Sequence, residues 1–182
     1  MKEKVNFLFI IDISGSMYEQ KIESVNASLA ECIAELKQIG HSSEYDIRVS
    51  IMTFAEKMKF CKINEKIDNI GMFHAKVEPQ EDGLYLITLF SCLYKGLKYL
   101  FDSKTIFDGQ QGKNTFIFLF SDARAVDEKA YNAAYEAIQN CIEFKNAIKY
   151  FGYVEVDCGK FNRETVRFVD CKADRIVSVS EV

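Results

Sequence analysis

The residues best suited to chemistry lie in one short stretch near the start of the chain. There, Asp12, Ser14 and Ser16 place three oxygen-bearing side chains at alternate positions, and Gly15 lets the backbone turn tightly among them. A carboxylate and two hydroxyls are ligands for a hard cation such as Mg²⁺, and no His or Cys stands nearby to favour a softer metal. Asp and Ser at such a turn also cap helices, so the turn alone leaves capping and metal binding equally open.

Two apolar runs lead into acidic residues and indicate how a site is assembled. Residues 7–11 and 116–120 are continuous apolar runs, typical of strands buried on both faces of a parallel sheet, and Asp12 and Asp122 follow them. If these strands are central neighbours, both carboxylates face the crevice beyond the carboxyl ends of the sheet. Thr88, at the start of an intervening helix, reaches the same edge. The convergence favours a hard-metal site built from Asp12, Ser14, Ser16, Thr88 and Asp122.

Strands and helices alternate along the chain and position these side chains. The pattern predicts a doubly wound α/β fold: a mostly parallel, Rossmann-like sheet with helices on both faces and right-handed crossovers. Residues 57–63 are predicted to return as an antiparallel edge strand, and Gly40 to end the first helix. The other strands are predicted at 7–11, 45–55, 114–120, 148–156 and 175–179, and helices at 18–39, around Leu93, Leu97 and Leu100, at 127–144 and at 162–169. The helix at 127–144 is predicted to bury Ala130, Ala134, Ile138, Cys141 and Ile142.

Composition limits the classes of protein. Of 182 residues, 48% are hydrophobic and 27% charged, as expected for a single globular domain over residues 1–182. The net charge of −4 gives no basic surface for nucleic acid. The sequence contains no apolar run of membrane-spanning length, and we expect residues 1–5 to lead straight into the first strand rather than to belong to a signal peptide. We therefore expect a cytoplasmic protein that binds neither nucleic acid nor membrane.

The six cysteines are scattered and form no C-x-x-C pair. A zinc site requires clustered ligands, and disulfide frameworks belong to small secreted chains. We expect inert, partly buried thiols at Cys32, Cys61, Cys92, Cys141, Cys158 and Cys171.

The stretch from Asp12 to Ser16 matches the D-x-S-x-S motif of the von Willebrand factor A (VWA) domains and their integrin inserted-domain relatives, and Met17 is also frequent there. The resemblance extends over essentially the whole chain. It implies a metal-ion-dependent adhesion site (MIDAS) that holds Mg²⁺, with Mn²⁺ or Ca²⁺ as alternatives. Ser14 and Ser16 would bind the metal directly, Asp12 and Asp122 would supply charge directly or through water, and Thr88 would join from the middle loop. The chain also resembles bacterial VWA proteins linked to tellurium resistance and stress response.

Two positions depart from the family pattern. Leu86-Ile87 precede Thr88, where Gly or Ser is usual, so that Ser91 and Thr105 stay open as alternative ligands. Ala123-Arg124 follow Asp122, where the family often has Gly. Arg124 places a cation near the site, where it either recruits an acidic group of a partner or pairs with a surface carboxylate.

These features favour a binding module over an enzyme. A cation held by few protein ligands keeps a position open for an Asp or Glu of a partner protein. No nucleophile–base pair is evident, and His41 and His74 are expected on the surface. The alternative is a Mg²⁺-dependent phosphatase of the haloacid-dehalogenase type, but such enzymes use a second aspartate two residues after the first, where this chain has Ser14. A dinucleotide site is disfavoured because the first turn lacks G-x-G-x-x-G.

Overall fold

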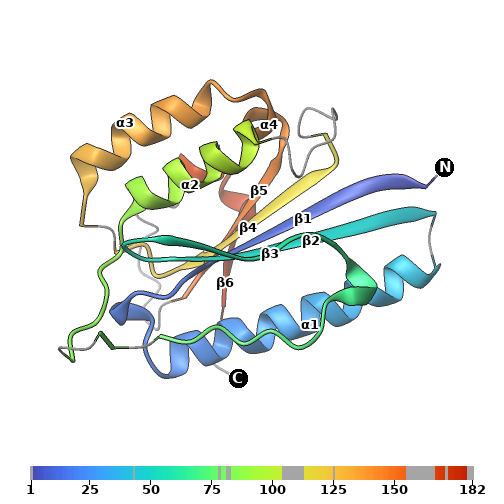
Figure 1. Cartoon of the computed structure of the whole chain (residues 1–182), viewed down its shortest axis with the longest axis horizontal. Helices are drawn as coiled ribbons and strands as arrows, with labels where there is room; N and C mark the ends of the chain where they lie inside the picture. The colour runs from blue at the N-terminus through green and yellow to red at the C-terminus, as the bar shows by residue number, and fades with distance from the viewer. Residues whose placement is uncertain are drawn as a thin grey trace.

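The computed structural model describes residues 2–42, 44–77, 79–80, 83–103, 113–124, 126–154, 167–170 and 172–179. Within these ranges, one six-stranded sheet carries helices on both faces (Figure 1). The strands are β1 (Glu3–Asp12), β2 (Tyr45–Phe54), β3 (Met58–Lys66), β4 (Thr115–Ser121), β5 (Ile148–Tyr153) and β6 (Ile176–Ser178). The helices are α1 (Gln20–Ser42), α2 (Phe90–Asp102), α3 (Glu128–Gln139) and α4 (Ile142–Asn146).

The order of the strands confirms the predicted doubly wound sheet. The order is β3-β2-β1-β4-β5-β6, and every neighbouring pair is parallel except β2 and β3. β1 and β4 are adjacent in the centre, with Phe7 opposite Phe116 and Ile11 opposite Phe120. Because parallel neighbours end at the same edge, the residues that follow β1 and β4 are brought together.

Two apolar cores explain why the central strands are hydrophobic without alternation. Leu8 and Ile10 of β1 pack into the core beneath α2, α3 and α4. Phe9 and Ile11 point the other way, into the core beneath α1. Figure 1 shows α1 alone on its face of the sheet and the other three helices opposite. A strand covered on both faces buries each successive side chain.

The predicted antiparallel edge strand is confirmed as β3, although it continues to Lys66. Met58 and Phe60 pack against the core beneath α2, and Lys59 between them is exposed. Charged side chains on an edge strand discourage pairing with another chain.

The boundaries predicted for the first helix are wrong at both ends. A short 3-10 helix, Gly15–Met17, comes first, α1 begins at Gln20, and α1 continues through Gly40 to Ser42. A Cβ atom at Gly40 would lie 3.2 Å from Cγ2 of Ile67. Gly40 therefore permits close packing of α1 against the segment after β3 and does not end the helix.

The helix predicted at 127–144 is two helices, because the chain turns at Asn140 and Cys141. Asn140 ends α3, and Cys141 has extended dihedrals, φ −82° and ψ 120°. The turn redirects the chain so that Phe144 of α4 is fully buried. The predicted inward face is accordingly only half right: Ala134 and Ile138 are buried and Cys141 is partly buried, but Ala130 and Ile142 are exposed.

Some predicted elements lie outside the described residues: most of the helix at 162–169, the end of the strand at 148–156 and most of the loop at 102–113. The last predicted strand is confirmed as β6. Of the helices in the described part of the chain, none combines the length and apolarity that crossing a bilayer requires.

Candidate functional site

Asp12 is the innermost residue of the candidate site and has no exposed surface. It is the last residue of β1, between β2 and β4. Its Oδ1 accepts a hydrogen bond from the amide of Ser14 at 2.9 Å, and its Oδ2 accepts from Ser121 Oγ at 2.6 Å and from Thr88 Oγ1 at 3.4 Å. The carboxylate is therefore held in place by three segments of the chain.

The turn after Asp12 brings both serine hydroxyls toward the same point. Ser14 Oγ and Ser16 Oγ lie 3.2 Å apart, and Thr88 Oγ1 donates to Ser14 Oγ at 2.6 Å. The amide of Gly15 donates to the carbonyl of Leu86 at 2.8 Å, which ties this turn to the loop that carries Thr88. A Cβ at Gly15 would lie 2.4 Å from Cβ of Tyr85, so only glycine fits between the two loops.

Thr88 lies in the cluster, as predicted from the sequence, and is buried. It comes two residues before α2, and its carbonyl accepts from the amide of Val126, so the loop is also fixed to the segment after β4. Of the two alternatives, Ser91 lies in the first turn of α2, where its amide donates to Asp127, and Thr105 lies outside the described residues. Thr88 is thus the hydroxyl of the middle loop that the fold brings to Asp12 and Ser14.

Asp122 closes the cluster from the end of β4, and its side chain is fully buried. Oδ1 accepts from Ser16 Oγ at 3.1 Å and from the amide of Arg124 at 3.3 Å. Oδ2 lies 2.8 Å from Lys21 Nζ and 3.5 Å from Arg124 Nε. Ala123 has a φ of +57°, a left-handed conformation that glycine adopts more readily.

The charge of Asp12 is poorly compensated by the protein. Burial raises the pKa of Asp12 from 3.8 to about 6, because the buried carboxylate loses its solvation. The hydrogen bonds from Ser121 and Ser14 lower the pKa, and the nearby Asp122 charge raises it. Lys21 supports Asp122 rather than Asp12. A further cation among these oxygens would therefore be stabilised.

Sequence reasoning missed two members of the cluster, Ser121 and Lys21. Ser121 is fully buried and donates a hydrogen bond of 2.6 Å to Asp12, shorter than those from Ser14 and Thr88. A small polar residue at the end of a buried apolar strand, next to Asp122, was the available signal. Lys21 lies in the first turn of α1, where a cation opposes the helix dipole, and that unusual position was its only signal.

The donor chemistry fits a hard divalent cation. The side chains of Asp12, Ser14, Ser16, Thr88 and Asp122 offer only oxygen atoms, and hydrogen bonds link them into one cluster. Across the described ranges, no three His, Cys, Asp or Glu side chains gather closely enough to hold a metal ion. Any metal at this edge therefore depends on hydroxyl ligands beside two carboxylates, a combination suited to Mg²⁺.

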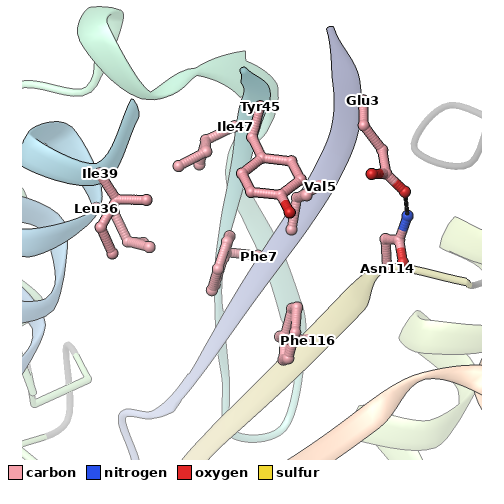
Figure 2. A pocket seen from close by; sticks show the side chains of 9 residues that line it. All are labelled: Glu3, Val5, Phe7, Leu36, Ile39, Tyr45, Ile47, Asn114 and Phe116. Atoms are coloured by element: carbon pink, nitrogen blue, oxygen red, sulfur yellow. Dashed lines mark hydrogen bonds between the residues drawn. The ribbon is translucent and has the colours of Figure 1, made fainter. Parts of the chain in front are cut away.

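A separate pocket of about 380 Å³ opens where β1 and β2 begin and α1 ends (Figure 2). Its wall is mainly apolar, and Glu3 in it accepts a hydrogen bond from Asn114 Nδ2 at 2.6 Å. The five candidate ligands are not among its lining residues. The oxygen cluster is thus a site at the carboxyl edge of the sheet, away from this pocket.

The two histidines and the four described cysteines lie outside the oxygen cluster. His41 lies 3.6 Å from Asp68, and His74 lies 3.4 Å from Glu23, both on the surface as predicted. Burial raises the pKa of Cys32 and of Cys92, which favours the unreactive thiol. The described cysteines, Cys32, Cys61, Cys92 and Cys141, are all free, whereas Cys158 and Cys171 lie outside the described residues.

The fold and the cluster together define an open α/β domain with an oxygen-lined site at the carboxyl edge of its sheet. The sequence profile of the von Willebrand factor type A domain matches residues 6–157. The chain belongs to this family. A comparison with curated protein sequences gives no match.

Solved structures support the fold. Proximal thread matrix protein 1 from the mussel byssus has a TM-score of 0.61 at 10% identity, over 98% of this chain and 42% of that one. The ArnB paralog VWA2 from Sulfolobus acidocaldarius has a TM-score of 0.54 at 16% identity, again over 98% and 42%. BatB from Bacteroides thetaiotaomicron has a TM-score of 0.54 at 14% identity, over 98% and 91%. The chain thus spans less than half the length of the first two proteins, and identities this low establish a shared fold alone.

Proposed function

We propose that this domain is a protein-binding module that holds a divalent cation, Mg²⁺ in the first instance with Mn²⁺ or Ca²⁺ as alternatives, and recognises an acidic side chain of a partner through it. One observation carries the proposal: five oxygen-bearing side chains from three separate loops converge on one point. The five proposed ligands are Asp12, Ser14, Ser16, Thr88 and Asp122. A solved structure of the mussel byssus protein is described with a zinc-occupied MIDAS motif, which supports the proposal that this fold holds a metal.

Each proposed ligand has a distinct part. Asp12 and Asp122 supply negative charge from the ends of adjacent strands, and Ser14, Ser16 and Thr88 supply neutral oxygens. A bound divalent cation would supply a coordination position that the carboxylate of a partner can complete. A phosphatase of the haloacid-dehalogenase type would need a second aspartate two residues after Asp12, where this chain has Ser14, so the phosphatase alternative is not favoured.

The surface beside the cluster suits a protein partner. Tyr18 and Tyr85 lie with ring centroids 5.1 Å apart next to the Gly15 turn. Leu84 is 65% exposed and Ile87 is 49% exposed on the same loop as Tyr85. Exposed apolar side chains beside a charged centre are typical of interaction surfaces. We infer that the partner presents apolar side chains next to its acidic residue.

Three narrower expectations from the sequence stay predictions: the cytoplasmic location, the part in tellurite and stress response, and the absence of enzymatic activity.

Calorimetric titration with Mg²⁺ tests the metal site. Wild-type protein should bind one ion, and Asp12→Asn should bind at least about tenfold more weakly, a loss of about 1.4 kcal/mol. Asparagine preserves the shape of Asp12, and the hydroxyls of Ser121 and Thr88 can rotate to accept from its amide group. Lys37→Met, on α1, is the control and should bind as wild type does. Equal affinity in wild type and Asp12→Asn would reject the site.

Capture of partners from extract of the source cell tests the binding mechanism. Wild-type bait should retain a partner in Mg²⁺ and release it in EDTA, and Asp12→Asn bait should retain none in either buffer. The captured protein should lose binding when its own acidic residue is replaced by the matching amide. A partner that stays bound in EDTA would contradict metal-bridged recognition.

A further inference from the structure

We propose that Lys21 is a tethered competitor of the metal: its ammonium group occupies the place beside Asp122 and must withdraw before a divalent cation binds. The inference rests on the proposed function above and adds a residue that sets the affinity of the site. Lys21 Nζ lies 2.8 Å from Oδ2 of Asp122, and the Lys21 side chain is only 19% exposed. It lies in the cluster rather than in solvent.

The position of Lys21 in the helix shows that the contact with Asp122 is specific. Lys21 is the second residue of α1, and the backbone amides at a helix start favour anions over cations. An unpaired lysine there would be mildly destabilising and would extend into water. Its inward orientation is therefore explained by Asp122, which the fold brings from a residue 101 positions away in the sequence.

Both carboxylate oxygens of Asp122 already accept hydrogen bonds in this arrangement. Ser16 Oγ and the amide of Arg124 donate to Oδ1, and Lys21 donates to Oδ2. Arg124 Nε is 3.5 Å from the same oxygen, but the Arg124 side chain is 58% exposed and the contact is longer. Of these two cations, Lys21 is thus the one that a metal must displace.

Electrostatics explains why Lys21 and a divalent cation would exclude each other from the place beside Asp122. The negative charge of Asp122 disfavours ionisation of the nearby Asp12, and the Lys21 ammonium beside Asp122 offsets that charge. A divalent cation among the same oxygens would be repelled by an ammonium at this distance. The lysine stem is long and flexible enough to swing into solvent once the metal takes its place. The site therefore exchanges one cation for another.

Lys21→Met tests this inference, because methionine keeps much of the apolar stem and removes the charge. Lys21→Gln is the second variant, which also keeps a hydrogen-bond donor for Asp122. Lys37→Met, on the same helix, is the matched control. Affinity for Mg²⁺ is measured by calorimetry, and the melting temperature is measured in EDTA and in Mg²⁺.

Both Lys21 variants should bind Mg²⁺ at least about tenfold more tightly than wild type. In EDTA they should melt at a lower temperature, because the two carboxylates lose their counter-charge, and the rise in melting temperature on adding Mg²⁺ should be larger. Lys37→Met should match wild type in all three measurements. Variants that bind Mg²⁺ with wild-type or lower affinity would overturn the part assigned to Lys21 and leave the metal site standing. Absence of binding in wild type and both variants would overturn the metal site and this inference with it.

Discussion

A carboxylate with no exposed surface is costly to ionise, and Asp12 is such a group. Its pKa of about 6, against 3.8 for the free side chain, corresponds to about 3 kcal/mol between the two protonation states. The cost falls on the folded protein when no cation is present. A cation bound beside Asp12 would offset this cost and so stabilise the folded protein.

This cost gives a pH dependence in EDTA. Because the pKa of Asp12 is raised in the folded state, its stabilising contribution is complete below 3.8 and lost as the pH rises through about 6. Asp12→Asn carries no such charge. In EDTA, urea unfolding should therefore find Asp12→Asn more stable than wild type at about pH 7, and the difference should shrink toward about pH 4.

Addition of Mg²⁺ at neutral pH should make wild type more stable than Asp12→Asn, since only wild type keeps both carboxylates for the cation. Asp102→Asn is the control, because its side chain is 59% exposed and lies at the end of α2. It should show no reversal. A wild type that is more stable than Asp12→Asn in EDTA at neutral pH would contradict the assigned cost.

Residue types and their positions after two buried strands were enough to predict the five residues that the structure clusters. The turn of Asp12, Ser14 and Ser16 alone left helix capping equally open, and Asp122 at the end of the neighbouring strand decided between the two. Lys21 could not be found in this way. The part proposed for Lys21 depends on its contact with Asp122, and the sequence around Lys21 does not indicate that Asp122 lies beside it in the fold. Ser121 likewise reads as an ordinary strand end until β1 and β4 are placed side by side.

At the scale of elements, one acidic residue joins two helices. Asp127 precedes α3 but makes no side-chain cap for it. Its carboxylate instead accepts from the amides of Phe90 and Ser91, the first two residues of α2, at 3.0 and 2.9 Å. Leu89, at the N-cap of α2, has no side chain that could do this. Asp127 therefore caps a helix far from it in the sequence.

Asp127→Ala should leave both amides of α2 without an acceptor. We expect a loss of about 1–2 kcal/mol in the free energy of unfolding, measured with urea. Hydrogen exchange should accelerate at Phe90 and Ser91 in particular. Glu136→Gln, on the exposed side of α3, is the control and should change neither quantity. Unchanged exchange at the two amides would show that the carboxylate is dispensable to α2.

The strength of each sequence signal decided which elements were predicted correctly. Continuous apolar runs predicted β1 and β4, because few other structures bury every residue. The break between α3 and α4 was missed, since apolar residues continue past Asn140 at nearly helical spacing. Lys149 on β5 could not be foreseen as buried: its ammonium lies 2.8 Å from Asp170, a residue outside the strand.

At the scale of the whole molecule, the doubly wound sheet and the central position of β1 beside β4 followed from general rules. Alternation of strands and helices with right-handed crossovers leaves few arrangements that place two buried strands in the centre. The pockets that side-chain packing leaves open could not be predicted from the sequence. The pocket in Figure 2, between the end of α1 and the start of β1, reflects side-chain volumes that periodicity does not encode.

The two ends of β1 should behave independently. Val5 lines the pocket and Asp12 lies in the cluster, about 23 Å apart along an extended strand. Val5→Ala should lower the free energy of unfolding by about 1 kcal/mol and leave Mg²⁺ affinity unchanged. In the double variant with Asp12→Asn, the two losses or gains should add within about 0.5 kcal/mol. A larger coupling energy would reveal communication along the strand.

The tilted ring pair of Tyr18 and Tyr85 has a consequence for spectroscopy. The chain contains nine tyrosines and no tryptophan, so tyrosine emission is not lost by energy transfer to indole. The two rings lie beside the Gly15 turn with an interplanar angle of 47°, on the loops that carry the candidate ligands. A change in those loops alters the coupling of the rings and hence the fluorescence and the near-ultraviolet dichroism. The domain therefore carries a native optical probe at the edge of the candidate site, and no label is needed to test whether Mg²⁺ changes these loops.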